Sequence, residues 1–176
     1  MFMRSLCSAA ALVVCASSVY AQGPSAIGIT MGYPASVGVI WNTSDAIAIR
    51  PELSLGGQSV SPSGAVKTTS HSITIGADAL FYMHTYDHLR TYVAPHLDYS
   101  HASNTISSDS GTTATNHSIG AAGSFGAQYS LSDRFGVFGE VGLGFTHSSL
   151  SGSAFGAGGT ANAWGTRAGV GVIFYP

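Results

Sequence analysis

Residues 129–145 read YSLSDRFGVFGEVGLGF, two alternating runs joined by a Ser-Asp turn. After the turn, large apolar side chains occupy most of the alternate positions from Phe135 to Phe145. The positions between them carry mainly glycine, together with Phe138 and Glu140. Because successive side chains of a strand point to opposite faces, this pattern predicts a strand with one apolar face and one small, sparsely charged face.

The same alternation recurs along the rest of the chain, and every charge within the alternating runs falls on the face opposite the large apolar side chains. No apolar run beyond residue 21 approaches the length of a transmembrane helix. We therefore expect an all-β fold, an eight-stranded antiparallel up-and-down transmembrane β-barrel. The strands are predicted at about 25–33, 36–42, 45–57, 69–83, 89–101, 116–130, 134–149 and 161–175.

The connections between these strands differ in length according to their order. Those after the second, fourth and sixth strands are tight and lie at 43–45, 84–88 and 131–133. Those after the third, fifth and seventh are longer and rich in Ser, Gly and Thr, at 58–68, 102–115 and 150–160. Short turns at one end and long loops at the other are typical of transmembrane barrels, whose long loops face the outside of the cell. The first connection, at 34–36, is short and departs from this rule.

Charge is scarce throughout the chain. Charged residues make up 8% of it, and Lys67 is the one lysine, whereas a soluble domain has roughly a quarter of its residues charged. A soluble barrel of the lipocalin kind needs a charged exterior around an apolar interior, the reverse of this pattern. The sequence therefore favours an apolar exterior in lipid and a narrow, polar lumen. The net charge is −2 and the sequence contains no cluster of basic residues, which argues against nucleic-acid binding.

The first residues predict export. A short basic start and a weakly apolar run are followed by a small-residue pattern ending at Ala21, which indicates a cleavable signal peptide at 1–21 and a barrel domain at 22–176. Export through the general secretory route follows. An uncleaved anchor or a lipid-modified Cys15 are the alternatives. Since Cys7 and Cys15 both lie in this segment, the mature chain has no disulfide.

Aromatic side chains on the apolar face predict two membrane-interface girdles. Phe135 and Phe145 are ten residues apart, as are Trp164 and Phe174. Ten residues at about 3.3 Å each, tilted by roughly 40°, cover about 25 Å, the height of the apolar band of such barrels. The outer girdle is expected to contain Tyr33, Tyr99, Phe145 and Trp164, and the inner one Trp41, Phe81, Tyr129, Phe135 and Phe174.

Residues 129–145 and the final strand at 164–175 resemble the OmpA/OmpX-type family of small outer-membrane barrels. The resemblance implies a location in the outer membrane of a Gram-negative cell envelope. It also implies contact with outer-membrane lipid and lipopolysaccharide, and recognition of the last strand by the barrel assembly machinery. One departure is that the family usually ends in an aromatic residue, whereas this chain ends in Pro176, so Phe174 would have to take that role.

Six ionisable residues of the inward face are expected at similar mid-barrel height: Arg50, Glu52, Asp78, His96, Glu140 and Arg167. The interior of an eight-stranded barrel is just wide enough for side chains, so charges there must be paired. The expected pairs are Arg50 with Glu52 or Asp78, and Glu140 with Arg167. Such a cluster would plug the lumen. The alternative is a narrow ion pore that is gated when the pairs exchange.

Four histidines are predicted on the outward face near the outer rim. Hairpins that turn symmetrically would set His71 opposite His101, and His117 opposite His147. They would form a polar belt at the membrane interface. A sharper hypothesis is that they gain charge in mildly acidic medium and bind anionic lipopolysaccharide. No metal or other cofactor is expected.

Residues 101–104 resemble the His-x-Ser-Asn motif of the outer-membrane lipid A deacylase family. The resemblance implies that His101 would activate Ser103 for acyl transfer, with a Glu to orient the histidine. No Glu lies between Asn104 and Glu140, and Glu140 is expected to point inward. A lipid A acyl hydrolase is therefore kept only as an alternative.

The function expected from these features is non-enzymatic. A closed barrel with a plugged polar lumen would serve adhesion or envelope integrity through its Ser-, Gly- and Thr-rich loops. Those loops could present a surface for an extracellular ligand without a preformed pocket.

Overall fold

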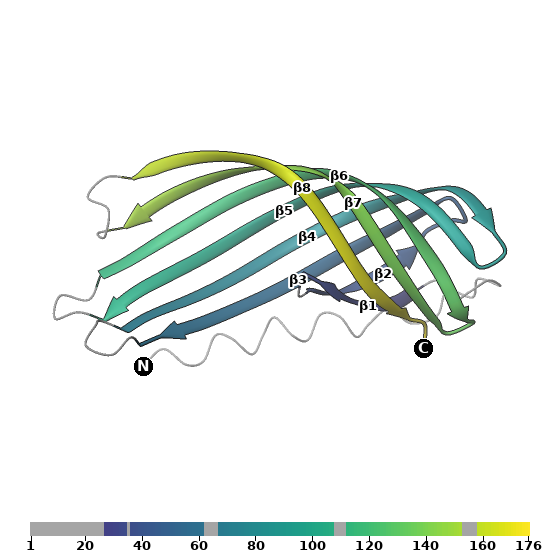
Figure 1. Cartoon of the computed structure of the whole chain (residues 1–176), viewed down its shortest axis with the longest axis horizontal. Helices are drawn as coiled ribbons and strands as arrows, with labels where there is room; N and C mark the ends of the chain where they lie inside the picture. The colour runs from purple at the N-terminus through teal and green to yellow at the C-terminus, as the bar shows by residue number, and fades with distance from the viewer. Residues whose placement is uncertain (1–26, 35, 62–66, 108–111, 153–157) are drawn as a thin grey trace.

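The computed structural model describes residues 27–34, 36–61, 67–107, 112–152 and 158–176. Each strand pairs antiparallel with the next, and the last pairs with the first, so the sheet closes into a barrel (Figure 1). The strands are β1 (Ile27–Tyr33), β2 (Ser36–Asn42), β3 (Ile47–Val60), β4 (Lys67–Tyr86), β5 (Leu89–Ser107), β6 (Thr112–Ser132), β7 (Phe135–Gly152) and β8 (Gly159–Phe174). The predicted eight-stranded, antiparallel, up-and-down fold is confirmed.

No helix in the described part of the chain is long and apolar enough to cross a membrane. Residues 1–26 lie outside the described residues, so the signal peptide at 1–21 stays a prediction, as does the beginning of the first strand at 25–26.

Strands β3 to β8 extend further toward their long connections than expected, so the predicted bounds of those connections, 58–68, 102–115 and 150–160, are wrong. β5 continues to Ser107 and β6 begins at Thr112, so most of the expected loop at 102–115 belongs to the β-ladder. The physical reason is that these residues are rich in Thr, whose branched side chain favours extended backbone. Their polarity led to the prediction of a loop, but these polar residues are the hydroxyl-rich ends of two strands. The connections at 62–66, 108–111 and 153–157 lie outside the described residues.

Short turns close the other end of the barrel, which we call the turn end; the opposite end is the loop end. The β2–β3 turn spans residues 43–46, whereas the β4–β5 and β6–β7 turns have two residues each. Asp87 and His88 join β4 to β5, and Asp87 has a φ of 41°, a left-handed conformation that Asp tolerates. A bulge between Tyr82 and His84 shifts the register of this hairpin. The β6–β7 hairpin has a matching irregularity between Ser130 and Ser132. These small features decide which residues face each other far from the turns.

The first hairpin is much shorter than the rest, because β1 and β2 have only seven residues each. β1 reaches β8 no further than the pair of Tyr33 with Val170, and β2 reaches β3 no further than Val37 with Leu53. In Figure 1 this purple hairpin ends near the middle of the molecule. Beyond it, toward the loop end, 54–60 of β3 pair only with β4, and 159–169 of β8 pair only with β7.

The two faces of the sheet differ as the alternation predicted. On β7, Phe135, Val141 and Leu143 are exposed on the outside, whereas Phe138 and Glu140 are buried inside. The nine aromatic residues assigned to the girdles are all exposed. The barrel therefore carries an apolar exterior and encloses the ionic groups at mid-height, Arg50, Asp78 and Glu140.

The interior near the turn end is a packed apolar core. Its members come from six strands and the chain end: Ile40, Ala48, Leu80, Tyr92, Ala94, Phe138, Ile173 and Tyr175. This is a correction, because the inward face was expected to be small and polar over the whole height of the barrel. The inward aromatic residues were visible one by one, but only closure of the barrel brings them together.

The packing of this core rests on glycines opposite the large rings. A Cβ atom on Gly126 would lie 2.6 Å from the hydroxyl oxygen of Tyr92 and closer still to its ring. Gly126→Ala is therefore expected to lower the free energy of unfolding by about 1–3 kcal/mol through overpacking. Gly123→Ala on the same strand is the matched control, because its Cβ would meet nothing within 4 Å. Urea titrations scored by gel mobility would measure both, and equal effects would contradict this packing.

Candidate functional site

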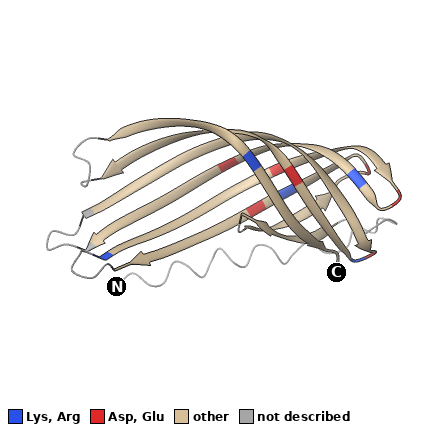
Figure 2. Ribbon diagram, in the orientation of Figure 1, with Lys and Arg blue, Asp and Glu red and all other residues tan. Residues whose placement is uncertain are grey.

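A buried guanidinium at mid-height organises the interior charges. Arg50 on β3 is 1% exposed, and its Nη2 lies 3.0 Å from Asp78 Oδ2 and 2.9 Å from Glu140 Oε2. Its Nε lies 2.9 Å from Glu52 Oε1, and the group also lies over the ring of Phe138 at 4.6 Å. A planar guanidinium with five donors can serve several carboxylates at once. Figure 2 shows a group of acidic and basic residues across the middle of the barrel, with others near its two ends.

Strand register places part of this network directly. Arg50 pairs with Asp78 between β3 and β4, and Asp78 pairs with His96 between β4 and β5. His96 Nδ1 lies 2.9 Å from Asp78 Oδ1, and its Nε2 lies 3.4 Å from Asp98 Oδ1. Three neighbouring strands thus supply an unbroken chain of polar contacts along one side of the lumen.

The second cation is held more loosely than the first. Arg167 Nη2 lies 3.5 Å from Glu140 Oε1 and 3.8 Å from Asp78 Oδ1, and its side chain is a quarter exposed. Within this network, four carboxylates face the guanidinium groups of Arg50 and Arg167, so among these six groups the negative charges exceed the positive ones by two. The carboxylates are Glu52, Asp78, Asp98 and Glu140.

All six residues expected at mid-height come together in this network, and both sets of expected pairs are present. The other contacts of the network were not foreseen; across the lumen they include that of Arg50 with Glu140 and the hydrogen bond that the hydroxyl of Tyr92 donates to Glu140 Oε2 at 3.2 Å. Asp98 was also missed as a member. Contacts across the lumen join strands that are not neighbours in the sheet, so no register argument from sequence could find them. The role of the network stays a proposal.

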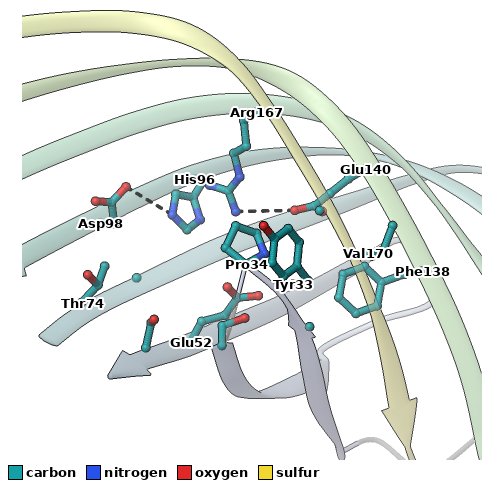
Figure 3. A pocket seen from close by; sticks show the side chains of 15 residues that line it. Tyr33, Pro34, Glu52, Thr74, His96, Asp98, Phe138, Glu140, Arg167 and Val170 are labelled. Carbon is teal, nitrogen blue, oxygen red and sulfur yellow. Dashed lines mark hydrogen bonds and ion pairs between the residues drawn. The ribbon is translucent and has the colours of Figure 1, made fainter. Parts of the chain in front are cut away.

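Toward the turn end the network lies on the apolar core, and toward the loop end it borders a cavity. The hydroxyl of Tyr82 donates to Gln128 Oε1 at 3.0 Å, and Gln128 Nε2 donates to the hydroxyl of Tyr175 at 3.3 Å, which adds polar contacts to the core. The cavity beyond the network has a volume of about 320 Å³. Figure 3 shows the tip of the first hairpin, Tyr33 and Pro34, projecting beside it.

The predicted pairing of the histidines is wrong by two residues. His71 pairs with Ser103 rather than His101, and His117 pairs with Ser149 rather than His147. The cause is the two-residue turns and the bulges, which place the centre of each hairpin beyond the symmetric position assumed. Instead His101 and His117 face each other on β5 and β6, with their Nδ1 atoms 3.4 Å apart. His147 Nδ1 lies 2.7 Å from Asn162 Oδ1.

The four histidines nevertheless form a belt at similar height. His71 lies two residues to the loop side of the line through His101 and His117, and His147 lies two residues to its turn side. The strand ends are staggered in the same direction. Leu89, the first residue of β5, pairs with Tyr129, so β6 extends three residues further than β5 at the turn end. Such steps follow from the tilt of strands in a barrel.

This histidine belt separates two kinds of outward surface. The next outward side chains toward the turn end are apolar, and those toward the loop end are hydroxyls: Ile73, Tyr99, Ile119 and Phe145 against Thr69, Ser103, Thr115 and Ser149. A boundary of this kind is what a membrane interface requires. Binding of lipopolysaccharide by the belt stays a prediction.

The deacylase-like motif lacks the support of Glu140. His101 and Ser103 share the outward face of β5, and the recorded partner of the His101 ring is His117. Glu140 is buried inside the barrel and held by Arg50. Within the described residues, no group of three or more His, Cys, Asp or Glu side chains is arranged to hold a metal ion.

Tyr33 is lower in the barrel than expected. It pairs with Val170, six residues along β8 from Trp164, so it does not lie level with the outer girdle. The shortness of the first hairpin is the reason. Phe145 and Trp164, in contrast, are direct cross-strand neighbours on β7 and β8.

Comparison with solved structures finds the same fold in small outer-membrane barrels. The major outer membrane protein of Thermus thermophilus superposes with a TM-score of 0.58 at 10% identity, over 84% of this chain and 97% of that one. CarO of Acinetobacter baumannii gives 0.48 at 12% identity, over 90% and 100%, a value too low to add support. No family model and no curated protein sequence matches the chain. At such identity the likeness shows the fold alone.

Proposed function

We propose that the chain is an outer-membrane protein of OmpA/OmpX type, a non-conducting barrel with a structural and surface-interaction role. The observation that carries the proposal is the partition of side chains. On the turn-end side of the histidine belt, large apolar residues cover the outside, and the charged residues at mid-height, Arg50, Asp78 and Glu140, are buried within. That arrangement is favourable in acyl chains and unfavourable in water.

Two layers of the interior support a lumen closed to ions. At mid-height the Arg50 network occupies the centre of the lumen. Nearer the turn end, the side chains of Leu80, Tyr92 and Ile173 are each at most 1% exposed. An exchange of ion pairs would rearrange only the charged layer at mid-height. The apolar layer beneath would still bar hydrated ions, which speaks against the gated pore.

Planar-bilayer recordings test this closure. We expect no stepwise openings from the wild type, and none from Glu140→Ala, because the apolar core is unchanged in both. The folded state of each sample is checked by its heat-modifiable mobility on a gel. Reproducible openings in the wild type would refute closure, and openings confined to Glu140→Ala would favour the ion gate.

The surface role rests on the loop end. There β4 to β7 continue beyond the histidine belt with Ser- and Thr-rich faces, so they form a stiff hydroxyl collar rather than flexible loops. We assign adhesion or envelope integrity to this collar, with lipopolysaccharide as its expected lipid neighbour. The last strand, ending at Phe174, is the expected signal for the assembly machinery. Lipid A hydrolysis is not proposed, since Glu140 cannot orient His101.

A further inference from the structure

The barrel wall has a side opening toward the loop end. Beyond the first hairpin, 54–60 of β3 and 159–169 of β8 have no described strand between them. At mid-barrel that position is filled by β1 and β2, so the opening is two strands wide. The hairpin tip at Tyr33 and Pro34 bounds the opening on its turn-end side, and we call this edge the sill.

The cavity above the Arg50 network reaches this side opening. Its lining includes Tyr33 and Pro34 from the sill, Glu52 from β3, Arg167 from β8 and Asp98 from the far wall. Figure 3 shows these side chains surrounding one space, with the hairpin tip projecting into view between β3 and β8. The polar interior and the apolar exterior of the barrel therefore meet at this place.

The rim of the side opening is unusually apolar and exposed. Trp164 is 85% exposed, Tyr33 75% and Leu55 67%, the highest values among the large apolar side chains of the described residues. Leu55 lies on the β3 side, Trp164 on the β8 side and Tyr33 on the sill. Hydrocarbon lying in this opening would contact its rim and remove part of that apolar surface from contact with water or headgroups.

The interior end of the same space is negatively charged. Asp98 has an imidazole as its recorded partner, and Glu52 shares one guanidinium with Asp78 and Glu140. The two excess negative charges of the network are complementary to an ammonium group. A cation there would also lower the mutual repulsion of the carboxylates.

We propose that this side opening and cavity bind a cationic amphiphile, with its amine head beside Glu52 and Asp98 and its alkyl chain leaving over Tyr33, Trp164 and Leu55. The inference goes beyond the proposed non-conducting barrel but relies on its membrane location. Entry would be from the outer leaflet, sideways through the wall, and needs no passage across the membrane.

Fluorescence of Trp164 offers the test. In a Trp41→Phe background in phosphatidylcholine vesicles, Trp164 is the one indole left. We expect dodecylammonium with a brominated chain to quench it saturably, beyond the quenching by brominated dodecanol at equal membrane content. Ethylammonium, which has the head without the chain, should compete only at concentrations at least about 100-fold higher.

Charge variants locate the head. Asp98→Asn and, independently, Glu52→Gln are each expected to raise the dodecylammonium concentration that gives half-saturation by about five- to tenfold. Asp133→Asn, in a turn at the far end, is the matched control and should leave it unchanged. In a Trp164→Phe background, Trp41 should show no saturable quenching.

Quenching by brominated dodecanol equal to that by the ammonium compound, wild-type affinity in both acid variants, or saturable quenching of Trp41 would each overturn the proposal. Each sample is first shown to be folded and vesicle-inserted by heat-modifiable mobility. Failure of that step in the wild type would count against the membrane barrel itself, whereas failure of binding alone counts only against the amphiphile site.

Discussion

Arg50→Met is expected to lower the free energy of unfolding by about 3–5 kcal/mol, the typical cost of removing one partner from a buried ionic group. Arg50 is 1% exposed, and its Nε and Nη2 atoms lie within about 3 Å of three carboxylates. Met fills much of the same volume but neutralises none of these charges. Arg167 cannot replace it, because its nearest contacts to Glu140 and Asp78 are 3.5 and 3.8 Å.

Two further variants separate charge from packing. Arg134→Met removes a guanidinium from an exposed turn, and its effect should stay within about 0.5 kcal/mol. Adding Asp78→Asn and Glu140→Gln to Arg50→Met removes the stranded charges and should restore more than about 2 kcal/mol. Urea unfolding in vesicles, followed by gel mobility, gives all three values. A loss in Arg50→Met that the neutralised triple variant does not recover would mean that Arg50 acts through volume alone.

Local alternation was enough to predict the fold and the face of the sheet on which the charged residues of the lumen lie. Period two is a property of each strand by itself, so the side of the sheet that holds Arg50, Asp78 or Glu140 could be read without knowing any partner. Pairs between neighbouring strands, such as Arg50 with Asp78, then needed only an approximate register. The contact of Arg50 with Glu140 needed the closed barrel and was missed.

Register was the main source of error. A two-residue turn at Asp87 and His88, plus one bulge, moved the partner of His71 from His101 to Ser103. Bulges depend on local twist and leave little trace in composition, so the sequence offers no rule for placing them. The direct pair of His101 with His117 joins β5 to β6, two strands for which no register had been predicted.

Strand ends were the second source of error, with larger consequences. Ser and Thr residues near 102–115 were assigned to a loop, although β-branched threonines extend strands. The short first connection had been noticed as a departure from the length rule. Its consequence, a gap between β3 and β8, follows only when seven-residue strands are placed beside strands of 14 and 16 residues.

The central claim, that the apolar outside of the barrel lies in acyl chains, predicts a strong dependence on depth. Val141 is 58% exposed near the middle of the apolar band of β7. Val141→Arg is expected to lower the free energy of unfolding in vesicles by about 2–4 kcal/mol, the cost of an arginine at the bilayer midplane. Ser149 lies on the same strand and the same face, beyond the histidine belt, and Ser149→Arg should cost no more than about 1 kcal/mol.

The most direct measurement is therefore the difference between these two variants, taken from urea titrations in phosphatidylcholine vesicles. A gap of at least about 1 kcal/mol, with Val141→Arg the less stable, is the predicted result. If Val141→Arg were as stable as the wild type while Ser149→Arg was not, or if both were neutral, the outer face would not be lipid-facing and the account would be contradicted.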